Sequence, residues 1–235
     1  MPENLKALMY ETQYKDYSPD FLMYETLLDK NIPVIEFGSG TGRITQHLLK
    51  SGYKVYGIEK DKSYREYFSQ KIADKYFKNR FSFLSDITNA PEICNIIYPF
   101  NVLFHLDENH VINEIAKFEG HFWNKIIIEI DNIIYIDKDS FQTKTHNSLG
   151  YLFKEYFVRK PSHLVIKNQV IRDSKIILQF DYPLFFHKAK FILKLFERLF
   201  YHKKLYGDFK LNPYTKNSPK LVIVLSRSED IKINP

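Results

Sequence analysis

The sequence predicts an α/β fold, a doubly wound parallel sheet that carries an inserted antiparallel lid. Short apolar strands alternate with helical segments between residues 34 and 130, which is typical of a parallel sheet covered by helices on both faces. A glycine-rich segment, Gly38-Ser39-Gly40-Thr41-Gly42, follows the first of these strands and is here named the glycine turn. At 140–186 consecutive strands with short turn-like separators replace the alternation, and this change indicates the lid.

Length and composition are those of one folded domain without a membrane segment. The chain has 235 residues, 44 % of them hydrophobic, so it can bury a sizeable core. We find neither a signal peptide nor an apolar run near the ~20 residues that a bilayer span needs. The single cysteine, Cys94, lies in an apolar run and cannot form an internal disulfide. We therefore expect a buried, inert thiol in a cytoplasmic protein.

The elements expected before and within the sheet follow from apolar spacing and from turn residues. Residues 1–29 should form a helical cover whose last helix, at 20–29, stops before Pro33. The helix at 41–51 is amphipathic, and Gly52 ends it. In order, the expected core elements are the strand 34–37, the helix 41–51, the strand 54–59, the helix 62–77, the strands 81–84 and 93–98, the helix 108–119 and the strand 125–130.

The remaining strands belong to the lid and to the end of the sheet. The lid strands are expected at 151–158, 164–172 and 176–182, with turn-like separators such as Asp173-Ser174. Two late strands at 204–211 and 220–226 would complete the sheet. We expect a single domain with its core at about 30–135 and 186–235, an N-terminal cover at 1–29 and the lid at about 136–185. Lids of this kind commonly cover a small-molecule site.

Three acidic residues follow three successive strands of the predicted sheet. Glu36 lies two residues before the glycine turn, Glu59 ends the second strand, and Asp86 follows the third. Open α/β sheets bind ligands outside the carboxyl ends of their strands, where glycines let the backbone approach closely. A carboxylate at Glu36 suits a cationic amino group better than a phosphate, while Glu59 can accept from ribose hydroxyls and Asp86 from an adenine amino group. Each acid alone could be a solvated loop residue, but the three together favour a ligand site.

These residues resemble the class I S-adenosylmethionine (SAM)-dependent methyltransferases over about residues 10–130. The resemblance rests on 34–43, Gly57-Ile58-Glu59 and Ser85-Asp86-Ile87. It implies a Rossmann-like sheet of seven strands with the last one antiparallel, S-adenosyl-L-methionine as cofactor and S-adenosyl-L-homocysteine as product. The glycine turn would lie along the methionine part of SAM, with the ribose at Glu59 and the adenine at Asp86. The implied cofactor residues are Glu36, Phe37, Gly38, Ser39, Gly40, Gly42, Arg43, Glu59, Lys60, Asp86, Ile87 and Tyr98.

The segment after the fourth strand should face the transferable methyl group. Its run at 100–106 resembles the Phe-Asn-x-Leu-x-His-Leu run of small-molecule methyltransferases. His105 in this run could act as a general base, because the unperturbed pKa of histidine is near ~6.5. It could equally cap the next helix or pack against it.

The segment 10–17 resembles the Tyr-Asp-x-x-Tyr and Lys-Asp-Tyr opening of amino-sugar N,N-dimethyltransferases. Glu11 replaces the usual aspartate, and the gap between the two parts is shorter here. In such enzymes this segment folds over SAM, and its tyrosines contact cofactor and acceptor. The resemblance therefore implies roles for Tyr10 and Tyr17 beside His105 in catalysis. The alternative is that these tyrosines form the aromatic face of a packed helix.

Other site chemistries lack their motifs in this sequence. Asp131-Asn132 follows the fifth strand, as in metal-dependent catechol-type O-methyltransferases, but Tyr98-Pro99 stands where those enzymes have a further acid. We therefore expect no metal site. The sequence also lacks the Asn-Pro-Pro-Tyr signature of nucleic-acid amino methylation, a His/Cys zinc cluster and a Gly-x-Ser-x-Gly elbow.

The sequence thus predicts a SAM-dependent methyltransferase that acts on N or O of a small-molecule acceptor. No nucleic-acid or membrane partner is expected, and a homodimer is left open. The alternative is an RNA or protein methyltransferase that docks its substrate through the basic region 187–210, where seven Lys or Arg face only Glu197 and Asp208. A solvated helix face explains the same charge. A non-catalytic SAM-binding scaffold and a nicotinamide enzyme are the remaining alternatives.

Overall fold

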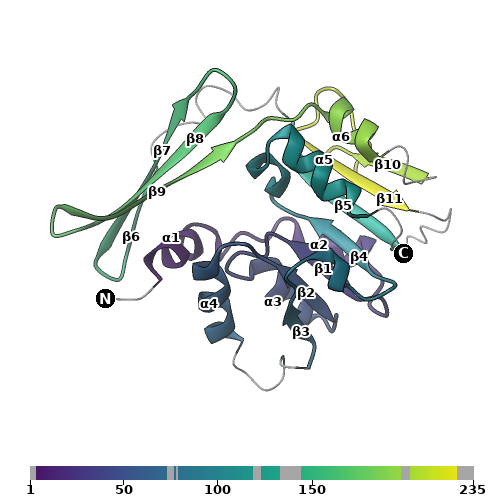
Figure 1. Cartoon of the computed structure of the whole chain (residues 1–235), viewed down its shortest axis with the longest axis horizontal. Helices are drawn as coiled ribbons and strands as arrows, with labels where there is room; N and C mark the ends of the chain where they lie inside the picture. The colour runs from purple at the N-terminus through teal and green to yellow at the C-terminus, as the bar shows by residue number, and fades with distance from the viewer. Residues whose placement is uncertain are drawn as a thin grey trace.

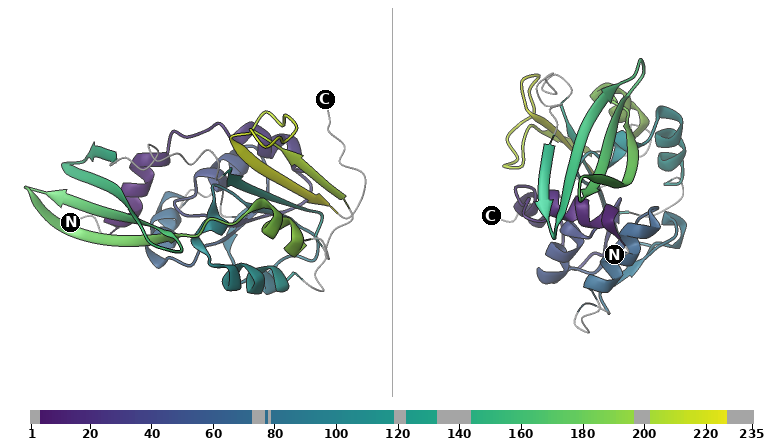
Figure 2. Two further views of the ribbon diagram at one scale, coloured as in Figure 1. Left: turned by 90° about the horizontal axis from the view of Figure 1, so that it is seen from above. Right: turned by 90° about the vertical axis from the view of Figure 1, so that its left-hand side faces the viewer.

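Two sheets organise the chain, as the computed structural model in Figure 1 shows. The structure describes residues 4–72, 77, 79–118, 123–132, 144–196 and 202–226. The larger sheet has seven strands in the order β10-β11-β5-β4-β1-β2-β3, and the smaller has four in the order β6-β7-β8-β9. The four-stranded sheet is the lid that the sequence predicts. It projects from one end of the molecule, beside α1 (Figures 1 and 2).

The bounds of the elements are as follows. The strands are β1 (Val34–Phe37), β2 (Val55–Ile58), β3 (Phe81–Phe83), β4 (Asn95–Tyr98), β5 (Lys125–Asp131), β6 (Lys144–Ser148), β7 (Tyr151–Arg159), β8 (Leu164–Arg172), β9 (Lys175–Leu184), β10 (His202–Tyr206) and β11 (Lys220–Ser226). The helices are α1 (Leu5–Tyr14), α2 (Phe21–Leu27), α3 (Arg43–Lys50), α4 (Lys62–Lys71), α5 (Glu108–Ala116) and α6 (Ala189–Phe196), with the short 3-10 helices η1 (Ile87–Asn89) and η2 (Val102–His105).

The strand β1 is the centre of the larger sheet. It pairs in parallel with β2 on one side and with β4 on the other. The strands β3 and β5 continue the parallel arrangement outward, whereas β11 runs antiparallel to both β5 and β10. All four residues of β1 are buried, as a strand covered on both faces must be. The predicted fold, a doubly wound seven-stranded sheet with an antiparallel lid, is confirmed.

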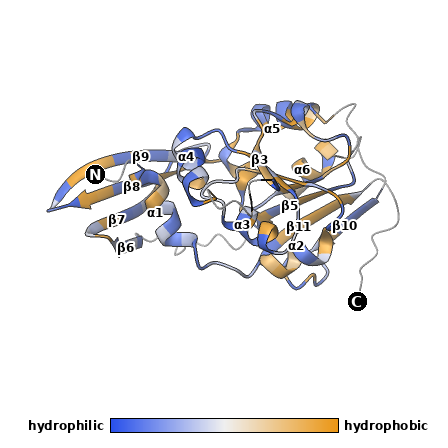
Figure 3. Cartoon of the chain, turned by 90° about the horizontal axis from the view of Figure 1, so that it is seen from below, coloured by the Kyte–Doolittle hydropathy of each residue, from blue (hydrophilic) through white to orange (hydrophobic). Residues whose placement is uncertain are grey.

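Alternate residues of the central strands face two different hydrophobic cores. Ile96 and Ile126 belong to the core covered by α5 and α6, and Ile97 and Ile127 belong to the core covered by α2 and α3. Figure 3 shows the apolar strand β11 beside the more polar edge strand β10. Cys94 lies in the first core, where burial raises the pKa of its thiol to about 12. The expectation of a buried thiol is therefore confirmed.

Two residues of the glycine turn have no room for a side chain. Gly42 has a φ of +82°, and a Cβ there would lie 2.1 Å from Cε2 of Phe68. Gly38 has a φ of +65°, and its Cβ would lie 2.3 Å from Cγ2 of Val102. Both conformations are strained for residues with side chains. The glycine turn therefore lets α4 and η2 pack closely against the end of β1.

The lid is a meander of four antiparallel strands in which β7, β8 and β9 pair in sequence. One end of its inner face packs on α1, where Met9 contacts a cluster formed by Tyr151, Phe153 and Val170. The strand β6 was not predicted. Its five residues are polar and mostly exposed, so they carry no alternation of apolar and polar positions for a sequence reading to detect.

Several predicted boundaries are wrong. The strand expected at 204–211 covers only His202–Tyr206, because the Asp208 carboxylate accepts from the backbone N–H groups of Lys210 (2.9 Å) and Asn212 (3.1 Å) and folds the chain into a turn. The helix expected at 62–77 ends at Lys71, and the strand expected at 93–98 begins at Asn95.

Several segments of the predictions lie outside the described residues, among them the start of the lid at 136–143 and the part of the region 187–210 at 197–201. Across the part of the chain that the structure describes, no helix is long and apolar enough to cross a membrane.

A buried ion pair fastens the N-terminal segment to the larger sheet. The Arg43 guanidinium donates to both carboxylate oxygens of Asp20, over 2.7 and 2.6 Å. The side chain of Asp20 is 0 % exposed and that of Arg43 is 7 % exposed. The guanidinium also donates to the backbone carbonyl of Tyr17 over 2.7 Å. Such a bidentate pair in a dry site is sensitive to the loss of either partner.

The substitution Asp20→Ala should lower the free energy of unfolding by about 3–5 kcal/mol, because it leaves the Arg43 charge buried without its partner. Urea denaturation of the purified variant measures the effect. The control is Asp16→Ala, which removes an exposed carboxylate from the same segment and should stay within about 0.5 kcal/mol of the wild type. Equal stabilities of the two variants would contradict the assignment of Arg43–Asp20 as a stabilising contact.

Candidate active site

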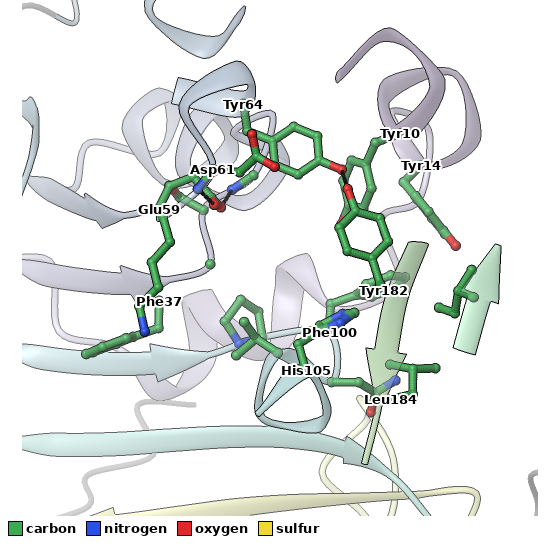
Figure 4. Close-up of a pocket in the computed structure, with 18 of the residues that line it drawn as sticks. Tyr10, Tyr14, Phe37, Glu59, Asp61, Tyr64, Phe100, His105, Tyr182 and Leu184 are labelled. Atoms are coloured by element: carbon green, nitrogen blue, oxygen red, sulfur yellow. Dashed lines mark hydrogen bonds between the residues drawn. The ribbon is translucent and has the colours of Figure 1, made fainter. Parts of the chain in front are cut away.

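A cavity of about 570 Å³ lies between the larger sheet, α1 and the inner face of the lid. The segments that follow β1, β2 and β4 line it, together with residues of α1, α4, β7, β8 and β9. Figure 4 shows its side chains reaching from α1, from the β2–α4 connection and from β9 toward a common space. The strand order reverses between β1 and β4, which is where open α/β sheets bind ligands. The volume is in the range of small-molecule pockets.

The structure brings most of the predicted site residues to this cavity. The residues that line it are Tyr10, Glu36, Phe37, Gly38, Ser39, Gly40, Arg43, Glu59, Lys60, Tyr98 and His105. The predicted residues outside the lining are Tyr17, Gly42, Asp86 and Ile87.

Glu59 ties the end of β2 to the glycine turn. Its carboxylate accepts from the backbone N–H of Gly40 and from that of Asp61, each over 2.8 Å. Burial raises the pKa of Glu59, and these two hydrogen bonds oppose the shift. The carboxylate is thus held at the cavity wall by main-chain donors, as an acceptor for a ligand should be.

Glu36 is a buried acid without a cationic partner at hydrogen-bond distance among the described residues. Its side chain accepts from the Thr45 hydroxyl, and the residue is 2 % exposed. Burial raises the pKa of Glu36 to about 8, against the opposing influence of the Thr45 hydrogen bond and the Arg43 charge. Its carboxyl group is therefore mostly protonated at pH 7, and a cationic ligand group beside it would favour the carboxylate.

Tyr17 contributes to the packing around Arg43 instead of to the cavity lining. Its ring lies 5.0 Å from the Arg43 guanidinium, on which Phe21 and Phe100 also pack. The guanidinium and the Asp20 carboxylate thus form the centre of an aromatic cage. A contact between Tyr17 and a bound molecule stays a prediction.

Asp86 and Ile87 are occupied by the fold. The Asp86 carboxylate accepts from the Lys117 ammonium over 2.8 Å and from the backbone N–H of Thr88 over 3.2 Å. The Lys117 hydrogen bond is the main cause that lowers the pKa of Asp86. Ile87 is buried in a hydrophobic core. The adenine contact implied for Asp86 stays a prediction, and it would require Asp86 to share or release Lys117.

The connection after β4 is held in an unusual backbone conformation. Phe100 and Asn101 have φ values of +49° and +60°. The Asn101 side chain exchanges two hydrogen bonds with Asp131, from Nδ2 to Oδ2 over 2.7 Å and from the Asp131 N–H to Oδ1 over 2.6 Å. Lys220 pairs with Asp131 over 2.6 Å. Asp131 is thus engaged by contacts within the fold, and these contacts hold the segment that leads to His105.

His105 ends η2 and faces the cavity, where its side chain is exposed. Its ring meets the Tyr182 ring edge-on, with 5.9 Å between the centroids. The surrounding protein removes part of its hydration and lowers the pKa of His105 below 6.5, while a hydrogen bond to the Pro183 backbone partly opposes the shift. The imidazole is therefore neutral at pH 7 and able to take a proton.

Tyr10 lines the cavity from α1 and packs against other rings at the same time. Its ring centroid lies 4.8 Å from that of Tyr14 and 5.7 Å from that of Tyr64. Burial raises the pKa of Tyr10, so its hydroxyl remains protonated at neutral pH. Tyr10 therefore lines the cavity, as the first sequence interpretation expects, and also belongs to the aromatic face of a packed helix, as the second expects.

Sequence reasoning missed a polar cluster that joins α1, α4 and the lid. Lys6 pairs with Asp61, the N-cap of α4, and its ammonium lies 4.7 Å from the centre of the Tyr182 ring. The hydroxyl of Tyr182 bonds that of Tyr64 (Figure 4). These residues come from three distant parts of the chain, so no local motif could have revealed them.

Comparison with known proteins gives a consistent result. The family described as "methyltransferase domain" matches residues 35–118. An uncharacterised methyltransferase from Bacillus cytotoxicus is 28 % identical over 165 residues, which cover 64 % of this chain and 75 % of the relative. The CcbJ methyltransferase from Streptomyces caelestis has a similar structure, with a TM-score of 0.68 and 18 % identity over 92 % of this chain and 96 % of that one. KedS8, a sugar N-methyltransferase from Streptoalloteichus sp., has a TM-score of 0.67 and 10 % identity, covering 95 % and 93 %.

The family match contains most of β1, the glycine turn, Glu59 and His105, and so includes most of the part of the cavity built by the larger sheet. The sequence relative is named a methyltransferase, and the solved structures share the fold over almost the whole chain. Residues 35–118 thus match a methyltransferase domain, and the comparisons together support a class I SAM-dependent methyltransferase with S-adenosyl-L-methionine as its cofactor.

Proposed function

We propose that this enzyme transfers the methyl group of SAM to a nitrogen or oxygen atom of a small-molecule acceptor. The observation that carries the proposal is the extent of the cavity, which runs from the glycine turn to the inner face of the lid. Cofactor and acceptor would share this one space, and the acceptor part of it is walled by lid strands. The similarity to a sugar N-methyltransferase is in line with a small-molecule acceptor.

The residues at the sheet end of the cavity fit SAM. The Glu36 carboxylate would hold its amino group, and the Glu59 carboxylate would accept from the ribose hydroxyls. Gly38 and Gly40 leave the backbone accessible along the methionine part. SAM supplies a methyl group that its sulfonium already activates, so the protein mainly orients the reactants and excludes water.

His105 is proposed as the group that takes the proton from the acceptor. Its neutral imidazole lines the cavity at the end of η2, and the Asn101–Asp131 contacts hold the segment before it. Tyr10 and Tyr17 stay candidates for orienting the reactants. Their raised pKa values make the phenols weaker sources of a base at neutral pH than the imidazole.

The alternative, an RNA or protein substrate docked on 187–210, has less support. Within the described part of this region, Ile192 and Phe196 of α6 are buried in a core, whereas Lys188, Lys190 and Lys194 are exposed. This is the arrangement of a solvated helix face. None of these lysines lines the cavity.

The test of the proposal uses SAM labelled on its methyl group, incubated with the enzyme and an extract of the source cells that is then fractionated by size. We expect label in the small-molecule fraction, and its appearance should require native enzyme. Label in RNA or protein would overturn the proposal in favour of the alternative.

We also propose that the enzyme acts in the cytoplasm, because its single cysteine, Cys94, is a buried free thiol.

Glu59→Ala should weaken SAM binding by roughly 1–3 kcal/mol, because charge-assisted hydrogen bonds are lost. Calorimetric titration measures this, with Glu66→Ala as the control, since Glu66 is exposed on α4. Unchanged affinity in folded Glu59→Ala would rule out the ribose contact. Asp86→Ala belongs in the same series, and a loss of similar size would place the adenine beside Asp86.

SAM binding at pH 6.5 should release close to one proton. Glu36 is protonated in the free enzyme because its pKa is about 8, and the cationic amino group of SAM would favour the carboxylate. The binding enthalpy should therefore differ between phosphate and Tris buffers, and the release should fade as the pH rises through about 8. Glu36→Gln should bind without this buffer dependence. Equal enthalpies for the wild type would contradict the placement of the amino group.

His105→Ala should lower turnover by about 10²–10⁴-fold and leave SAM affinity nearly unchanged. The wild-type rate should fall as the pH is lowered through the His105 pKa, which lies below 6.5, because protonation removes the base. This acidic limb should be absent in the variant. His110→Ala, an exposed histidine on α5, is the matched control. An acidic limb that persists in His105→Ala would assign the base to another residue.

A further inference from the structure

One row of side chains interrupts the apolar inner face of the lid. The register places Lys144 of β6 opposite Glu155 of β7, and Glu155 opposite Asn168 of β8. All three residues line the cavity. In β7 and β8 the neighbouring rows are apolar, Phe153 with Val170 on one side and Phe157 with Ile166 on the other.

Glu155 and Asn168 of this row are buried but incompletely paired, whereas Lys144 is exposed. Glu155 is 5 % exposed and Asn168 is 3 % exposed. Nδ2 of Asn168 has no hydrogen-bond partner in the described part of the protein. Buried amide donors without partners are rare, because their desolvation costs free energy that nothing returns. At the wall of a binding cavity, the missing partner is expected to come from a ligand.

Glu155 supplies a hydrogen-bond acceptor next to the unpaired donor of Asn168. Its carboxylate is 3.8 Å from the Lys144 ammonium, which is too far for a hydrogen bond. Gln13 lies near this carboxylate and influences its pKa, but Nε2 of Gln13 has no hydrogen-bond partner among the described residues. A carboxylate has several acceptor positions. A free donor on Asn168 thus stands beside a free acceptor position on Glu155. A ligand ammonium group could donate to Glu155 but could not accept from Asn168, and an ether oxygen could accept from Asn168 but could not donate to Glu155. A hydroxyl group can do both.

We propose that Glu155 and Asn168 bind a hydroxyl group of the methyl acceptor and thereby select a hydroxylated small molecule. This inference rests on the function proposed above and specifies the substrate class. The hydroxyl is distinct from the reacting atom, because His105 contacts Tyr182, whereas Asn168 pairs with Phe180 in the next row of β9. The rings of these two lid residues offer apolar surface to the carbon skeleton of the acceptor.

The first arm of the test is the stability of Asn168→Leu without ligand. A leucine has a similar size and removes the unpaired amide, so the melting temperature should stay the same or rise. Scanning calorimetry measures it. Gln169→Leu on the opposite face of β8 is the control, and it loses the hydrogen bond from Gln169 to Gln179. A melting temperature several degrees lower for Asn168→Leu would show that the fold itself uses the amide, and would overturn the inference.

The second arm is methyl transfer to the small-molecule fraction of the cell extract, at limiting extract concentration. Asn168→Leu and Glu155→Gln should label this fraction at least about tenfold more slowly than the wild type, as the loss of hydrogen bonds to a polar acceptor predicts. The rates should recover when more extract is added, SAM affinity should be unchanged, and Gln169→Leu should match the wild type. The labelled product should gain mass on O-acetylation, which detects its free hydroxyl.

The outcomes separate the two proposals. If the wild type labels no small molecule, the proposed function fails and this inference fails with it. If the wild type labels a small molecule and Asn168→Leu keeps pace within twofold, only the inference is overturned. A slow rate that does not recover with added extract, or a product without a free hydroxyl, overturns it as well.

Discussion

The complete burial of β1 is the constraint on which the other features of the site depend. Strands flank β1 on both sides and hydrophobic cores cover both of its faces, so Glu36 within it loses its water and keeps a proton. The chain can leave this crowded position only through a turn with little side-chain volume, which explains Gly38 and Gly42. The buried acid Glu36 and the glycine turn, which both line the cavity, thus follow from the same burial of β1.

Buried charges near the cavity fall into two groups. Arg43 with Asp20, and Lys220 with Glu129 and Asp131, form compact pairs that hold neighbouring segments in place. Paired in this way, buried charges add rigidity more than free energy. Glu36 and Glu155 have no such close ionic partner, and both line the cavity. The paired groups hold segments of the fold, and the under-paired groups are the ones for which contacts with the reactants are proposed above.

The sequence predicted the larger sheet well, because a buried parallel strand can be recognised from a short apolar run such as Val34–Phe37. The acids at strand ends followed from the same periodicity. It did not predict that Lys117 would pair with Asp86, or that Tyr182 would meet Tyr64, because such contacts depend on how distant segments pack. Three of the lid strands were predicted from the sequence. Their own pattern does not show which face lines the cavity, because that depends on the packing of the lid against α1.

The environment of Cys94 has a practical consequence for attaching a probe to the lid. Its thiol is enclosed by a hydrophobic core and is mostly un-ionised at any pH used for protein labelling, and alkylating reagents require the thiolate. A cysteine introduced at an exposed position such as Leu149, at the β6–β7 turn, would then be the reactive one without removal of the natural residue. A fluorophore or spin label attached there would report whether the lid changes position during turnover, in an otherwise unaltered enzyme.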